Sequence, residues 1–135
     1  MLTKIDHIGL AVSNLEEALK FYEGVLGLKS SAIETVEEQK VKIAFLSLGE
    51  SKLELLQPTD PESPVARFIN SRGEGVHHIA LKTENIEKVL QELEDRGVRL
   101  IDKIPRQGAG GKKVAFLHPS ASFGALLELC EENNK

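Results

Sequence analysis

The chain has 135 residues, 41% of them hydrophobic, which suits one compact domain better than two independent ones. Its formal net charge of −4 argues against a nucleic-acid partner, because binding to a phosphate backbone needs concentrated Lys and Arg. The single cysteine, Cys130, excludes an intrachain disulfide, and no apolar run approaches the roughly 20 residues that span a bilayer. Without a signal-like N-terminal stretch, we expect a cytoplasmic protein with no membrane partner.

The first predicted elements form a βαβββ module over about residues 4–57. Lys4–Val12 alternates with a period of two, which predicts a strand. A helix is predicted from Ser13 to Gly27, because Ser13 and Glu16 form a capping box, apolar residues follow at helical spacing, and Gly27 supplies a stop. Three further strands are predicted at residues 28–34, 41–48 and 52–57.

A connector and a second module follow. Ser63 as N-cap, Pro64 at the first helical position and Gly73 after the end delimit a short helix over about residues 63–73. The second module, about residues 75–131, repeats the order of the first. Its predicted elements are a strand at 75–83, a helix at 85–96 ended by Gly97, and strands near 98–103, 113–117 and 125–130.

The two modules also match in sequence. DHIGLAV from Asp6 is answered by HHIAL from His77, so that His7 corresponds to His78 at an offset of 71 residues, the difference between positions 78 and 7. KIAFL and KVAFL recur at the same offset, and each leads into an apolar strand with one glutamate, Glu54 in the first module and Glu128 in the second. Two histidines and two glutamates therefore occupy equivalent positions.

Strand alternation predicts where these four side chains point. The leucines that flank Glu54 and Glu128 fall on one face of each strand and the glutamate falls on the other. His7 and His78 likewise oppose the more apolar side of their strands. If helices cover the apolar faces, the four groups point to the uncovered side, where a poorly solvated carboxylate needs a partner. A divalent cation is such a partner.

A single histidine or glutamate on a strand is more often a structural or solvated residue than a metal ligand. Recurrence at matching positions on the same face favours the metal-ligand interpretation for this set. His77, next to His78 but on the other face, is instead expected to pack or to form a hydrogen bond. The GAGG stretch at residues 108–111 lacks the spacing of a Walker loop, so we expect a flexible turn there.

These motifs together resemble the vicinal oxygen chelate superfamily. Within it, DHIGLAV, FYEGVLGL, LELLQP, GVHHIAL, FLHP and LLEL resemble the methylmalonyl-CoA epimerases, and the resemblance runs from Ile5 to Glu131. The FLHP segment at residues 116–119 differs from glyoxalase I relatives, which tend to carry an acidic residue before that proline. The resemblance implies an α+β fold in which two paired βαβββ modules form a cupped mixed sheet around a metal site, in a single domain spanning residues 1–135.

The resemblance also implies a ligand set. It maps the metal ligands onto His7, Glu54, His78 and Glu128, although some family members carry Gln at the position of Glu54. It implies one divalent ion per chain, Co²⁺ in the first place with Ni²⁺, Mn²⁺ or Zn²⁺ as alternatives, and no organic cofactor. Such an N/O set suits these ions, and four protein ligands on an octahedral ion leave two adjacent positions for a bidentate substrate.

The implied activity is that of an isomerase. It is a metal-dependent epimerase that interconverts (2R)- and (2S)-methylmalonyl-CoA by 1,1-proton transfer through a metal-stabilised enolate, with Glu128 as a catalytic base. The implied partners are an acyl-CoA thioester and a second copy of the chain, with a dimer contact near Val65, Phe68 and Ile69. A second proton carrier is not assigned.

Two alternatives stay open. One is a glyoxalase I-type lyase or isomerase with the same ligands. The other is a non-enzymatic small-molecule-binding protein of the same fold, which the intact set of four disfavours.

Overall fold

The computed structural model describes residues 1–132. These residues fall into two compact units. The N-terminal unit spans His7–His77, and the C-terminal unit combines Met1–Asp6 with the chain from His78 onward. Each unit contains most of one predicted module, and the boundaries between the units lie within two strands of the fold.

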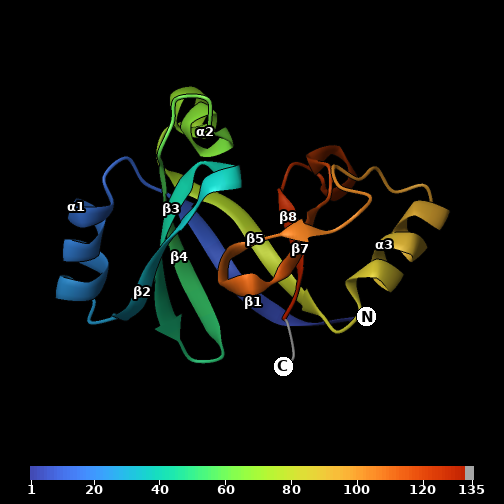
Figure 1. Cartoon of the computed structure of the whole chain (residues 1–135), viewed down its shortest axis with the longest axis horizontal. Coiled ribbons are helices and arrows are strands. Elements are labelled where there is room, and N and C mark those ends of the chain that lie inside the picture. The colour runs from blue at the N-terminus through green and yellow to red at the C-terminus, as the bar shows by residue number, and fades with distance from the viewer. Residues whose placement is uncertain (133–135) are drawn as a thin grey trace. The chain divides into compact units, whose positions relative to one another are not determined.

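A four-stranded mixed sheet forms the N-terminal unit, in the order β2-β3-β4-β1 (Figure 1). Its one parallel pair is β1 with β4, and the other neighbours are antiparallel. The strands are β1 (Leu2–Ala11), β2 (Lys29–Val36), β3 (Val41–Leu48) and β4 (Ser51–Pro58). All four predicted strands are confirmed, with their ends shifted by at most two residues.

The helix of this unit differs from its prediction at both ends. α1 (Leu15–Leu19) continues as a π-helix, η1 (Lys20–Val25), before Gly27 ends it at a φ of 79°. The N-cap is Asn14 rather than Ser13, and its side chain accepts the Glu17 N–H. The predicted capping box was wrong, because Asn14 caps the helix and the Ser13 N–H donates to the carboxylate of Glu74 at 2.7 Å rather than to Glu16.

The core of the N-terminal unit lies between its helix and one face of its sheet. Leu10 and Val12 at the end of β1, Ala44 and Leu46 of β3, and Leu55 of β4 pack against Leu15 and neighbouring helix residues. A 3-10 turn, η2 (Glu37–Gln39), joins β2 to β3. The connector helix α2 (Pro64–Arg72) is as predicted, because Ser63 caps it and Gly73 follows at a φ of 83°.

The C-terminal unit repeats this plan, with its strands in the order β5-β8-β7-β6. Again one pair, β5 with β8, is parallel and the others are antiparallel. Its elements are β5 (Gly75–Thr83), α3 (Ile86–Asp95), β6 (Arg106–Gln107), β7 (Lys113–Phe116) and β8 (Leu127–Glu131), with 3-10 turns η3 (Ala109–Gly111) and η4 (Pro119–Ser122).

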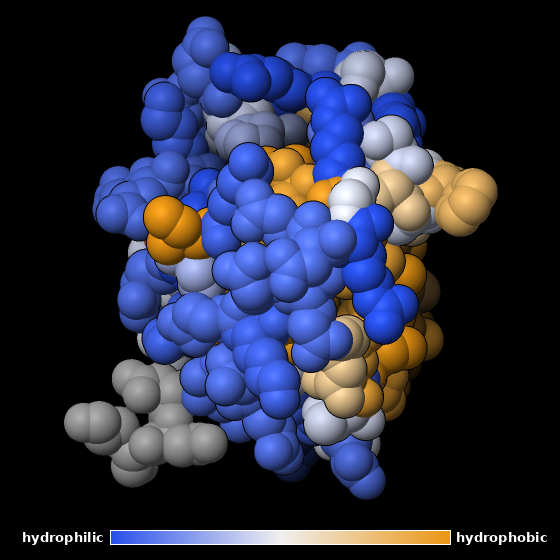
Figure 2. Space-filling model, turned by 90° about the vertical axis from the view of Figure 1, so that its right-hand side faces the viewer, coloured by the Kyte–Doolittle hydropathy of each residue, from blue (hydrophilic) through white to orange (hydrophobic). Residues whose placement is uncertain are grey.

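α3 covers one face of this sheet. Ile86, Val89 and Leu90 pack against Ala115, Leu117 and Leu129 of the strands. The outer side of α3 carries exposed polar residues such as Glu87 and Lys88, and hydrophilic side chains dominate the view in Figure 2, which faces the α3 side. The sheet face that α3 leaves uncovered is therefore the face available to polar groups.

The strand predicted near residues 98–103 was wrong. The chain there forms a loop with a single bridge between Leu100 and Leu117, and the edge strand β6 follows only at Arg106–Gln107. Asp102 explains the difference, because its side chain accepts the Phe116 N–H at 2.9 Å and replaces a ladder hydrogen bond. The GAGG stretch forms the turn η3, with Gly110 and Gly111 at positive φ.

The predicted α+β class with two βαβββ modules is confirmed. That both units belong to one domain over residues 1–135 stays a prediction. No helix within residues 1–132 is long and apolar enough to cross a bilayer.

Truncating Ile86 is expected to destabilise the fold. Its side chain is fully buried against β7 and β8, so Ile86→Ala should lower the free energy of unfolding by about 2–5 kcal/mol through lost burial and a residual cavity. Ile104→Ala is the control, because Ile104 is 79% exposed and its loss should cost less than about 0.5 kcal/mol. Urea denaturation of both variants measures the difference, and equal midpoints would contradict this account of the core.

Candidate functional site

The N-terminal unit brings together His7 and Glu54. His7 Nδ1 lies 3.3 Å from Glu54 Oε2, and the two residues are only 3% and 4% exposed. They reach each other because β1 and β4 are adjacent parallel strands, with Gly9 as the register partner of Glu54. Both side chains point away from the leucine core under α1, as the alternation predicted.

The neighbouring strand β3 adds no ionisable group to this face. Its register places Ile43 beside Leu56 and Phe45 beside Glu54, and Val41 shares their face. Lys42, in contrast, falls on the α1 side, where it lines a pocket of about 270 Å³. On the sheet face turned away from α1, called the ligand face below, β1 and β4 place the titratable side chains of His7, Lys52 and Glu54, of which His7 and Glu54 are buried.

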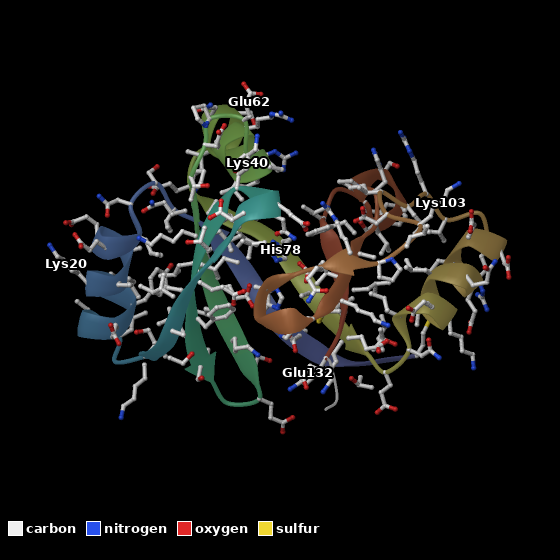
Figure 3. All side chains as sticks on the ribbon, viewed as in Figure 1. Lys20, Lys40, Glu62, His78, Lys103 and Glu132 are labelled. Atoms are coloured by element: carbon white, nitrogen blue, oxygen red, sulfur yellow. The ribbon has the colours of Figure 1, made fainter. Side chains whose placement is uncertain are left out.

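The C-terminal unit holds the equivalent pair. His78 Nε2 lies 3.1 Å from Glu128 Oε1, and the residues are 6% and 5% exposed. Glu128 on β8 lies between Ala80 of β5 and Phe116 of β7 in the sheet register. The Phe116 ring packs edge-on against the imidazole of His78, with 5.7 Å between ring centroids (Figure 3). This contact orients the ring of His78.

All four predicted ligands are thus buried, and each unit pairs one imidazole with one carboxylate. Burying such a carboxylate is costly unless it is hydrogen-bonded or neutralised, and a neutral imidazole supplies no charge. A divalent cation that accepts nitrogen and oxygen ligands would fit this donor chemistry. The same groups can accept or donate a proton in an environment from which water is largely excluded.

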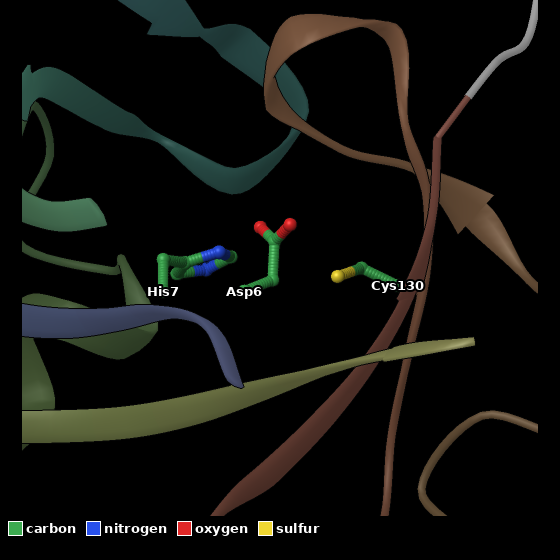
Figure 4. Close-up of side chains that lie close together, drawn as sticks. All are labelled: Asp6, His7 and Cys130. Carbon is green, nitrogen blue, oxygen red and sulfur yellow. The ribbon is translucent and has the colours of Figure 1, made fainter. Parts of the chain in front are cut away.

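A second polar cluster in the C-terminal unit was not predicted. Lys112 Nζ lies 2.6 Å from Asp6 Oδ2, and Asp6 is 1% exposed. Figure 4 shows Asp6 beside Cys130, whose pKa is raised, first by burial and then by the negative charges of Asp6 and Glu128. The thiol therefore stays protonated and is not a nucleophile. No sequence motif predicts this cluster, because Asp6 and Lys112 are far apart in the sequence.

His77 is also placed as expected. Its ring packs edge-on against Phe68 of α2 at 5.0 Å between centroids, so it serves packing in the N-terminal unit. The two adjacent histidines of β5 therefore have separate roles, and His77 provides a built-in comparison for His78.

Comparison with known proteins identifies the family. The sequence model of the Glyoxalase/Bleomycin resistance protein/Dioxygenase superfamily matches residues 6–116. The chain belongs to this superfamily. This agrees with the fold and with the repeated His and Glu positions of the two units.

Individual relatives align with almost the whole of this chain. An uncharacterized protein of Bacillus subtilis, YqjC, is 50% identical over 96% of this chain and 93% of its own. The mitochondrial methylmalonyl-CoA epimerase of Bos taurus is 36% identical over 95% of this chain and 74% of its own. A solved methylmalonyl-CoA epimerase in complex with methylmalonyl-CoA and NH4+ superposes with a TM-score of 0.94 at 38% identity, covering 98% of this chain and 96% of that one.

Proposed function

We propose that this protein is an isomerase that interconverts (2R)- and (2S)-methylmalonyl-CoA by 1,1-proton transfer. Relatives with that activity in their names align over almost the whole chain, and one of them is solved with methylmalonyl-CoA. The observation that carries the proposal is the buried His–Glu pair in each unit, since a binding protein has no need for two such costly pairs.

His7, Glu54, His78 and Glu128 together would hold one divalent ion. The mixed nitrogen and oxygen donors suit Co²⁺, and also Ni²⁺, Mn²⁺ or Zn²⁺. When bound, such an ion supplies a Lewis acid for the two oxygens that flank the acidic carbon of the substrate. Two pairs contributed by equivalent strands explain why one histidine and one glutamate recur at equivalent positions of the two modules.

Glu128 is the proposed base. In methylmalonyl-CoA the C2 carbon lies between a thioester carbonyl and a carboxylate, so removal of its proton gives a delocalised enolate. The Glu128 carboxylate is buried beside His78 and Phe116, which limits competition from water for the proton. Inversion also needs a proton donor on the opposite side of the planar carbon. Ile43 and Phe45 cannot carry a proton, so the return step must use a group outside the ligand face of β3.

We also propose a homodimer, on the strength of the resemblance alone. The predicted contact near α2 is partly used within the chain, because Val65 is buried and Phe68 packs against His77. A dimer interface would therefore need further apolar surface. Sedimentation velocity at micromolar concentration should show a species of twice the chain mass, and a single monomeric boundary would refute the dimer.

Metal content is expected to depend on the paired histidines. His7→Ala and His78→Ala should each weaken binding of the ion by orders of magnitude, because each removes a nitrogen ligand. His77→Ala is the matched control, since His77 packs on Phe68 and should leave the metal content unchanged. Elemental analysis of the purified proteins measures this, with circular dichroism to confirm folding. Equal metal in all four proteins would remove the site assignment.

Proton exchange at C2 tests the reaction itself. Incubating (2R)- or (2S)-methylmalonyl-CoA with the protein in deuterated water should place deuterium at C2 as the configuration scrambles, with no other bond changed. Glu128→Gln should lower turnover about 100-fold or more, because the amide cannot accept the proton. Glu132→Gln is the control and should not lower turnover, because Glu132 lies just past β8 with two-fifths of its side chain exposed.

Mass spectrometry of the recovered thioester and chiral analysis give the readout. Full activity in Glu128→Gln and in metal-stripped protein would refute the mechanism. Turnover of a glutathione hemithioacetal in place of methylmalonyl-CoA would select the glyoxalase alternative instead.

A further inference from the structure

One stretch of the C-terminal unit is strongly basic in an otherwise acidic chain. Residues 96–113, called the basic edge below, contain six basic side chains and one acidic side chain, whereas the whole chain has a net charge of −4. The basic edge runs from the end of α3 through the loop and β6 to the start of β7. Its basic residues are Arg96, Arg99, Lys103, Arg106, Lys112 and Lys113.

Part of this positive charge is used in ion pairs within the chain. Lys112 is paired with the buried Asp6, and Lys113 lies 3.0 Å from Glu87 of α3. Lys103, which is labelled in Figure 3, lies 3.4 Å from Glu94. Both side chains are well exposed, and ion pairs between exposed side chains contribute little to stability. Arg99 and Arg106 are exposed as well. Four basic side chains, those of Arg96, Arg99, Lys103 and Arg106, are therefore accessible to a ligand.

Arg106 connects the basic edge to the candidate active site. In the β6–β7 register it lies beside Val114, which shares a face with Phe116 two residues on. Its guanidinium carbon lies 5.6 Å from the centroid of the Phe116 ring, and that ring packs on His78. Arg106 therefore lies at the edge of the same sheet face that carries His78 and Glu128.

The guanidinium of Arg106 is held in place on one side only. Its Nε lies 3.3 Å from Asp102 Oδ1, while Asp102 Oδ2 accepts the Phe116 N–H. Within residues 1–132 its two terminal nitrogens form no ion pair or hydrogen bond, and the side chain is 47% exposed. A fork of donors fixed in this way matches the oxygens of a phosphate group.

We infer that the basic edge, through Arg106 with Arg99 and Lys103, binds the phosphate groups of the acyl-CoA. This assignment rests on the proposed function. Several cations suit a ligand that carries several phosphate charges, whereas the one carboxylate of the malonyl group is attached to the C2 carbon that loses its proton to Glu128. The flexible pantetheine arm separates the phosphates from the thioester, so phosphates held at the edge leave the acyl group free to reach Glu128.

Removing the Arg106 charge tests the inference. Arg106→Gln should raise the KM for methylmalonyl-CoA about 10- to 100-fold, the range expected for a lost charge-assisted contact, with little change in kcat. The KM of Arg106→Lys should lie between those of wild type and Arg106→Gln, since lysine keeps the charge but loses the forked set of donors. Lys88→Gln is the control, because Lys88 is exposed on α3, which covers the opposite face of the same sheet.

A truncated substrate identifies the anionic group. Methylmalonyl-pantetheine keeps the carboxylate and the thioester but lacks the nucleotide phosphates, so its KM should be the same for wild type and Arg106→Gln. An equal rise in KM for both substrates would place Arg106 on the malonyl carboxylate and overturn the inference. An unchanged KM for methylmalonyl-CoA would overturn it too.

Binding of free CoA separates this inference from the proposed function. Isothermal titration calorimetry with CoA needs no turnover, and Arg106→Gln should weaken its binding while Lys88→Gln does not. If wild type fails to epimerise methylmalonyl-CoA yet binds CoA through Arg106, the proposed function fails and the phosphate site stands. If wild type epimerises methylmalonyl-CoA but Arg106→Gln leaves CoA binding unchanged, the proposed function stands and the phosphate site fails.

Discussion

The cost of burying a carboxylate constrains each unit of this protein. Glu54 and Glu128 are 4% and 5% exposed, and an unpaired carboxylate at such burial would cost several kcal/mol. Each is placed beside a small residue, Gly9 or Ala80, which leaves room on the ligand face for an imidazole to approach within 3.1–3.3 Å. Small neighbours and a paired histidine are therefore both part of how the fold tolerates these charges.

The hydrophobic cores determine where these carboxylates point. Leu55, next to Glu54, and Leu129, next to Glu128, are buried under the helix of their own unit. A one-residue slip in either strand would send the glutamate into the core and the leucine to the ligand face. Helix packing on one face thus secures the strand register, and through it the position of the His–Glu pair on the other face of each sheet.

This coupling explains which features were predictable from the sequence. Period-two alternation and the repeated motifs of the two modules identified the strands that carry His7, Glu54, His78 and Glu128, because core burial imposes the alternation locally. The cap at Asn14 and the loop at Asp102 were missed. The cap is a local contact, since Asn14 accepts the N–H of Glu17, whereas the Asp102 side chain accepts the N–H of Phe116 from another strand and overrides the local signal for a strand.

Long-range polar contacts were unpredictable for the same reason. Lys112 reaches Asp6 across the sequence, and Arg106 packs over Phe116 only because β6 begins later than the alternation near residues 98–103 indicated. Neither contact has a periodic signature. The four candidate ligands could therefore be proposed from one sequence, whereas the residues that surround them required the fold.

The two modules diverge most in their outermost strands. β2 has eight residues, whereas its counterpart β6 has two, and the residues on either side of β6 form loops of the basic edge, which include the glycine turn η3. Gly108 is needed there, since a Cβ would approach Val114 to 2.7 Å. The strands that carry the His–Glu pairs lie further inside each sheet and keep the repeat. The outer strands carry none of these four residues, so β6 could be shortened and the neighbouring sequence could carry cations without disturbing the pair formed by His78 and Glu128.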